Sequence, residues 1–130
     1  MIQVVQPDGS DLHAVTSPPG GRDSYGDARP AWSPTGSQIA FTRGDGGDPR
    51  NGSGVVYVVS ARGGTPRRVG PGVAPVFSPH GRYLAYADRF DSSLAPRALH
   101  IADLWKPSLR VTLPGVLATT GFLDQLTWLP

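Results

Sequence analysis

The amino-acid sequence predicts an all-β protein. Residues that favour helices are scarce, because the 130 residues include no Glu, one Lys and one Met. The apolar runs are filled with Val, Thr, Tyr, Phe and Trp, which favour strands. Seventeen Gly and 14 Pro fall between these runs, where turns are expected. An internal repeat shows how these strands and turns follow one another along the chain.

Two segments share one pattern at a spacing of 45 residues. Residues 31–41 and 76–86 both contain Ser-Pro-x-Gly followed by alternating apolar residues. In a type I turn, Ser, Pro and Gly prefer the first, second and fourth positions, as they stand here. Residues 127–130 (TWLP) are a third, shorter copy. The pattern predicts a strand, a tight turn and a second strand in each unit.

A second repeat interleaves with the first. Residues 2–15 map onto residues 56–69 at a constant offset of 54, and residues 99–112 are a weaker copy 43 residues further on. Such spacings suit the four-stranded blade of a β-propeller. The predicted fold class is therefore a partial β-propeller of four-stranded antiparallel blades. It has two complete blades, an N-terminal pair of strands C and D, and a C-terminal strand A.

The predicted strands, named A to D within each blade, follow in chain order. A half blade in residues 1–16 supplies C (about 2–6) and D (12–16). The blade 30–69 contains A (30–33), B (38–43), C (55–60) and D (66–69), and the blade 74–113 contains A (74–77), B (83–88), C (98–103) and D (109–113). Residues 121–130 begin a further blade with an A strand at about 122–129. Trp32, Phe77 and Trp128 share one repeat position and are predicted to lie in the core between blades.

These motifs resemble the TolB-like β-propeller repeat, which is related to WD repeats. Residues 30–41 (PAWSPTGSQIAF) and 75–86 (PVFSPHGRYLAY) match its signature Pro-x-Trp-Ser-Pro-Asp-Gly-x-x-Ile-Ala-Phe. The Asp of the signature is replaced by Thr35 and His80, so no role of that Asp is carried over. The resemblance implies a scaffold for protein–protein contact or a non-catalytic domain beside a peptidase. It also implies a periplasmic or secreted location and a ring of six blades.

Composition narrows the function classes. Eleven Arg are scattered among ten Asp with no block of five like charges, which argues against nucleic-acid binding. The absence of Cys removes disulfides and thiol chemistry. No apolar stretch approaches the roughly 20 residues of a membrane helix, so membrane insertion is not predicted. The N-terminus has no export signal, and the sequence leaves the compartment open.

Strand direction predicts where binding residues gather. The A–B and C–D turns are short, whereas the B–C loops (43–54 and 89–97) and D–A loops (17–29 and 114–121) are long and lie together on the opposite face. Long loops on rigid strands are frequent recognition sites. The candidate binding residues on this loop face are Arg43, Asp45, Asp48, Arg50, Arg89 and Asp91. Solvated loop charges are the simpler interpretation of the same residues.

The sequence does not indicate catalysis. Asp45, Asp48 and Asn51 lack the spacing of an EF-hand, and His13, His80 and His100 lack metal-ligand spacing. No Gly-x-Ser-x-Gly motif and no paired carboxylates are present. We therefore expect no cofactor, no metal site and no enzymatic activity.

The predicted function is a non-catalytic scaffold that binds a protein partner through its B–C/D–A loop face. We expect the chain to be a fragment of a longer TolB-like protein. Two alternatives remain open: an accessory propeller of a larger serine-peptidase-type hydrolase, and a carbohydrate-binding propeller. The latter would use loop aromatics, of which Tyr25, Phe90 and Trp105 are present. Incomplete blades also leave open edges, so self-association is a further expectation. Two copies would give six blades if the terminal strands combined.

Overall fold

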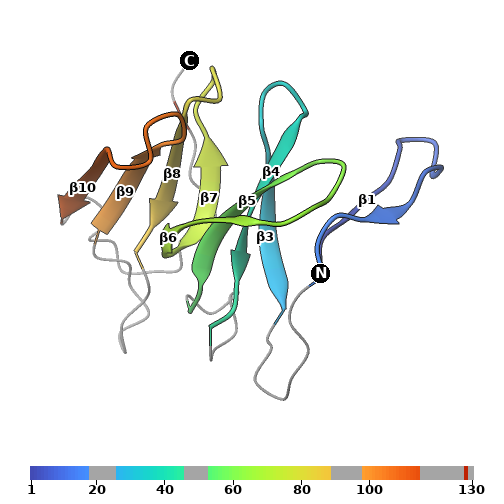
Figure 1. Cartoon of the computed structure of the whole chain (residues 1–130), viewed down its shortest axis with the longest axis horizontal. Helices are drawn as coiled ribbons and strands as arrows, with labels where there is room; N and C mark the ends of the chain where they lie inside the picture. Colours follow the sequence, from blue (N-terminus) through green and yellow to red (C-terminus); the bar gives the residue numbers. More distant parts are fainter. Residues whose placement is uncertain (18–25, 46–52, 89–97, 115–127, 129–130) are drawn as a thin grey trace.

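The computed structural model describes residues 1–17, 26–45, 53–88, 98–114 and 128. These residues form ten strands and no helix. The described residues therefore contain no helix that could cross a membrane. The strands are β1 (Gln3–Val4), β2 (His13–Ala14), β3 (Asp27–Trp32), β4 (Gln38–Arg43), β5 (Val55–Ser60), β6 (Arg67–Pro71), β7 (Val73–Phe77), β8 (Tyr83–Ala87), β9 (Ala98–Asp103) and β10 (Arg110–Pro114). Strands β3-β4-β5-β6 form the first sheet and β7-β8-β9-β10 the second, with every pairing antiparallel. Figure 1 shows the two sheets facing each other, with the β1–β2 hairpin beyond the first sheet. The predicted all-β class is confirmed.

The Ser-Pro-x-Gly turns have the same hydrogen bonds in both sheets. Ser33 O accepts the N–H of Gly36 at 2.9 Å, and Ser78 O accepts that of Gly81 at 2.8 Å, as a type I turn requires. Each Ser hydroxyl also accepts the backbone N–H of the first residue of the next strand, Gln38 or Tyr83, at 3.0 Å. The repeat therefore encodes how strand A passes into strand B.

Strand A differs from its prediction in both sheets. Strand β3 begins at Asp27, within the predicted D–A loop, and a bulge interrupts its pairing with β4 between Ala28 and Ala31. Strand β7 carries the equivalent bulge. Arg29 and Ala74, each followed by Pro, have φ of +53° and +54°, which is uncommon outside glycine. Proline cannot donate to a ladder, and the bulge places it where no donor is needed.

The main core lies between the two sheets. Its buried members come from both: Ala40, Val56, Val58, Val69, Phe77, Leu84, Tyr86 and Ala102. Strand β7 lies across β3, β4 and β5. The buried hydroxyl of Thr42 in β4 accepts the N–H of Ala74 in β7 at 3.2 Å, so a polar bond joins the sheets within this apolar interface.

A second core joins the hairpin to the opposite side of the first sheet. Its buried members are Ile2, Val15, Ile39, Phe41 and Val59. Phe77 is buried as predicted, but the prediction is wrong for Trp32, which is 52% exposed. Phe77 in β7 is covered because β7 packs against β3 and β4 of the first sheet. The hairpin in front of Trp32 has only two strands and no counterparts of β3 and β4, so it covers Trp32 less. The predicted strand 122–129 lies outside the described residues except for Trp128.

Gly72 alone separates the last strand of the first sheet from the first strand of the second. Its φ of +151° lies in a region that L side chains rarely adopt. A Cβ there would stand 2.5 Å from the carbonyl oxygen of Ala87 and 2.6 Å from the ring of Tyr86. The close approach of this connection to β8 therefore requires glycine.

Replacing Gly72 with Ala should destabilise the protein by about 4 kcal/mol or more, because backbone strain and a steric clash act together. Gly64→Ala is the matched control: its φ is +120°, but no atom lies within 4 Å of the added Cβ. It should cost only the strain, about 1–3 kcal/mol. Urea unfolding of both variants measures the difference, and equal losses would show that the close approach at Gly72 is unimportant.

Candidate functional site

Two of the six residues predicted for the loop face are described. Arg43 ends β4, and its side chain is only 15% exposed because it pairs with Asp27. Asp45 is exposed, and its Oδ1 accepts a hydrogen bond from the Ser53 hydroxyl at 3.2 Å. The other four candidates, Asp48, Arg50, Arg89 and Asp91, lie outside the described residues. The binding role of the loop face stays a prediction.

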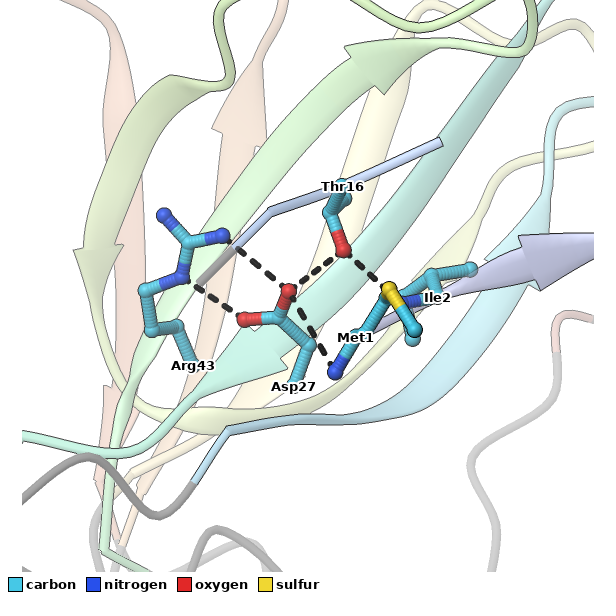
Figure 2. Close-up of polar contacts among 5 residues, drawn as sticks. All are labelled: Met1, Ile2, Thr16, Asp27 and Arg43. Atoms are coloured by element: carbon cyan, nitrogen blue, oxygen red, sulfur yellow. Dashed lines mark hydrogen bonds and ion pairs between the residues drawn. The ribbon is translucent and has the colours of Figure 1, made fainter. Parts of the chain in front are cut away.

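The buried carboxylate of Asp27, at the start of β3, contacts groups from β4 and from the hairpin (Figure 2). The side chain of Asp27 has no solvent exposure, and both of its oxygens bind Arg43: Oδ1 accepts from Nε at 2.7 Å and Oδ2 from Nη2 at 3.0 Å. Oδ2 also accepts from the hydroxyl of Thr16 and lies 3.9 Å from the Met1 amino group. The Thr16 hydroxyl in turn accepts the Ile2 N–H at 2.8 Å. This network fastens the hairpin to the first sheet.

Aromatic rings fix the guanidinium of Arg43 from the other side. It lies 5.3 Å from the ring centroids of both Phe41 and Tyr57, whose rings are themselves stacked 5.8 Å apart. A bidentate carboxylate and two rings leave Arg43 few free donors. Arg43 is therefore better placed to hold the blade together than to bind a ligand. Asp27 lies within the predicted D–A loop 17–29, so its pairing with Arg43 was not expected from the sequence.

Among the described residues, a group of exposed apolar side chains lies on the side of the second sheet that faces away from the first. We call it the outer face; it comprises Tyr83, Leu99, Ile101, Leu109, Val111 and Leu113, with Trp105 at its edge. Register places these side chains together, because Ile101 pairs with Val111 and Leu99 with Leu113. Val111 is 54% exposed and Trp105 72%. Isolated exposed apolar residues are common, but a contiguous group indicates an interaction site.

A polar cluster borders the outer face at the A–B and C–D turns. Arg82 binds Asp103 Oδ2 through Nε at 3.0 Å and Nη2 at 2.8 Å. Its guanidinium lies 5.1 Å from the ring centroid of Tyr83 and 5.4 Å from that of Trp105. The bond from Arg82, helped by the backbone N–H groups of Lys106 and Trp105, lowers the pKa of Asp103 below its ordinary value. Asp103 therefore stays charged at neutral pH and holds Arg82 between the two rings.

A groove of about 290 Å³ runs between this cluster and the apolar residues. It is lined by Arg82, Tyr83, Ile101, Asp103, Leu109, Arg110 and Val111. Arg, Tyr and Trp beside exposed aliphatic residues form the composition that is enriched at the energetic centres of protein interfaces. Trp105 was predicted only as a loop aromatic, whereas the other residues of this surface were assigned to strands or turns. The available signal was the alternation of Leu109, Val111 and Leu113, which makes one side of an edge strand apolar.

Two of the histidines, His13 and His100, contact neighbouring strands and turns. The ring nitrogens of His13 lie 2.9 Å from Asp11 O and 3.5 Å from Ala61 O, and the carbonyl of Asp11, followed by that of Ala61, raises the pKa of His13. His100 contacts Thr112 Oγ1 at 3.0 Å and Asp88 Oδ1 at 3.4 Å. Within the described part of the chain, no group of three or more His, Asp, Glu or Cys residues could hold a metal ion.

Asp27 and Arg43 should be strongly coupled in stability. Asp27→Asn and Arg43→Gln should each cost about 3 kcal/mol, because each leaves a buried partner unpaired. The double variant should cost less than the sum of the two, by about 1–3 kcal/mol. Chemical denaturation of the four proteins gives this coupling. Additive losses, within about 0.5 kcal/mol, would contradict a structural role for the pair.

Comparison with known proteins identifies the fold. No protein-family model matches the chain, and no curated protein sequence matches it. Among solved structures, TolB from Acinetobacter baumannii is similar, with a TM-score of 0.60 and 23% sequence identity over 85% of this chain. The chain spans 25% of the length of that TolB. Its two sheets and hairpin therefore have the fold of a segment of a TolB-like β-propeller.

Proposed function

We propose that this chain is a non-catalytic β-propeller scaffold that binds a protein partner through the outer face of its second sheet. The observation that carries the proposal is the exposed group of Tyr83, Leu109, Val111 and Leu113 beside the Arg82–Asp103 pair and Trp105. Burying such a group removes apolar area from water, which is the main driving force of association. The TolB-like fold agrees with a scaffold, although a fold alone does not determine function.

The polar border gives the surface specificity. Arg82 is already oriented by Asp103 and by the two rings, so little side-chain freedom would be lost when a partner binds. The rings of Tyr83 and Trp105 offer large rigid contact areas next to the groove. A pre-arranged Arg and aromatic group is what a binding hot spot requires.

The two alternative functions, an accessory domain of a hydrolase and a carbohydrate-binding domain, would make different use of the outer face. An accessory role beside a hydrolase would require the outer face to contact a catalytic domain. Carbohydrate binding would use Trp105, the described member of the loop aromatics, whose ring is largely exposed. The aliphatic residues Leu109, Val111 and Leu113 favour a protein surface over a sugar, because sugars offer many hydroxyl groups that an aliphatic surface leaves unpaired.

Photocrosslinking in the cells that naturally make the chain tests the proposal. A photoreactive phenylalanine at Leu109 should give a crosslinked protein, whereas one at the exposed turn residue Thr35 should not. Adding Val111→Asp should abolish the product at Leu109. A product that forms at Asp45 and not at Leu109 would instead assign binding to the loop face. The absence of a product at both positions would contradict a protein-binding role.

A further inference from the structure

The last strands of the two sheets, β6 and β10, approach each other at the rim of the structure. Arg110 in β10 pairs with Ala102, whose side chain belongs to the core between the sheets. Neighbours across a ladder point to the same side of a sheet, so Arg110 faces the first sheet. Its Nη2 donates to the carbonyl oxygen of Val69 in β6. This bond holds the guanidinium of Arg110 against β6.

Glycine at position 70 makes room for this guanidinium. A Cβ at Gly70 would stand 2.6 Å from Nη1 of Arg110 and 2.7 Å from the hydroxyl oxygen of Tyr86. The guanidinium and the phenol therefore lie side by side against the backbone of β6. Tyr86 in β8 is only 1% exposed, so its hydroxyl reaches the rim from the core.

Positive charge gathers around the hydroxyl of Tyr86. Burial, the largest effect, raises the pKa of Tyr86, whereas the charges of Arg110 and Arg68 lower it, so both guanidiniums lie near the phenol. Tyr86 keeps its proton at neutral pH and can donate it in a hydrogen bond. Asp88 also acts on Tyr86, but its carboxylate lies 3.4 Å from His100. Within the described part of the chain, neither arginine forms an ion pair with a carboxylate.

We propose that Arg110, Arg68 and the hydroxyl of Tyr86 bind a phosphate group at this rim. A guanidinium offers paired N–H donors that match phosphate oxygens, and two guanidiniums balance the charge of a phosphate at neutral pH. The hydroxyl adds a neutral donor. Both arginines are exposed, so a phosphate reaches them from solvent. A carboxylate has one charge and two oxygens, and it would leave some of these donors unused.

The phosphate site is independent of what covers the outer face. Its groups come from β6, β8 and β10, and they lie on the side of the second sheet that faces the first. A further sheet packed on the outer face would leave this side unchanged. The phosphate site and the proposed function are therefore separate claims, and the failure of either leaves the other standing.

NMR titration of the whole chain with sodium phosphate tests the site, at constant ionic strength and at about pH 7.5, where most of the phosphate carries two charges. The amide signal of Gly70 and the Nε–H signal of Arg110 should shift and saturate. Arg68→Gln should weaken binding about tenfold, because a charged donor is lost. Arg68 is exposed, so folding should persist, and circular dichroism checks it. Arg62→Gln, an equal charge change in an exposed turn, should leave the affinity nearly unchanged.

Further variants and ligands separate the alternatives. Tyr86→Phe removes only a hydroxyl and should weaken binding about threefold. Phosphoserine that binds as well as inorganic phosphate would support a phosphate carried by another molecule, whereas binding of inorganic phosphate alone would support the free ion. Acetate that binds as tightly as phosphate would overturn the assignment to phosphate. Shifts that do not saturate, or equal weakening by Arg68→Gln and Arg62→Gln, would overturn the site itself.

Discussion

Packing of one sheet face on the next holds this structure together. Each four-stranded sheet carries apolar side chains on both faces, so a single sheet cannot bury its own apolar area. The first sheet buries both faces, with the hairpin on one side and the second sheet on the other. Among the described residues, the second sheet buries only the face that lies against the first. The exposed outer face is therefore a consequence of the same sequence pattern that makes the core.

Polar groups determine how the packed units are aligned. Asp27, Arg43 and Thr16 join the hairpin to the first sheet at one end of the strands, and Thr42 joins the two sheets through the N–H of Ala74. At the other end of the second sheet, Arg82 binds Oδ2 of Asp103 through two nitrogens, and Oδ1 accepts the backbone N–H groups of Trp105 and Lys106. The two ion pairs differ in their setting: the first is enclosed, whereas the second borders exposed Trp105 and the groove. Only the second is placed to contact a partner.

The sequence predicted the strands and the sheet order because turn chemistry and the 45-residue repeat are local signals. Ser33 and Ser78 make the hydrogen bonds that Ser-Pro-x-Gly implies. The bulges at Arg29 and Ala74 could not be read in this way, since positive φ at a residue other than glycine has no reliable sequence signal. The early start of β3, which brings Asp27 to Arg43, depends on that bulge. The exposure of Trp32 and Val111 depends on how many strands of a neighbouring sheet pack on them. The position of a residue in the repeat therefore does not by itself predict its burial.

The central claim is that the second sheet buries one face against the first sheet and leaves its outer face open to a partner. Solvent paramagnetic relaxation of the methyl groups of Val111 and Leu113, with Val56 as the buried reference, measures this directly. The Val111 and Leu113 methyls should relax strongly and those of Val56 weakly, because the first two are exposed and Val56 is buried. Methyls of Val111 and Leu113 that are as well protected as those of Val56 would contradict the account.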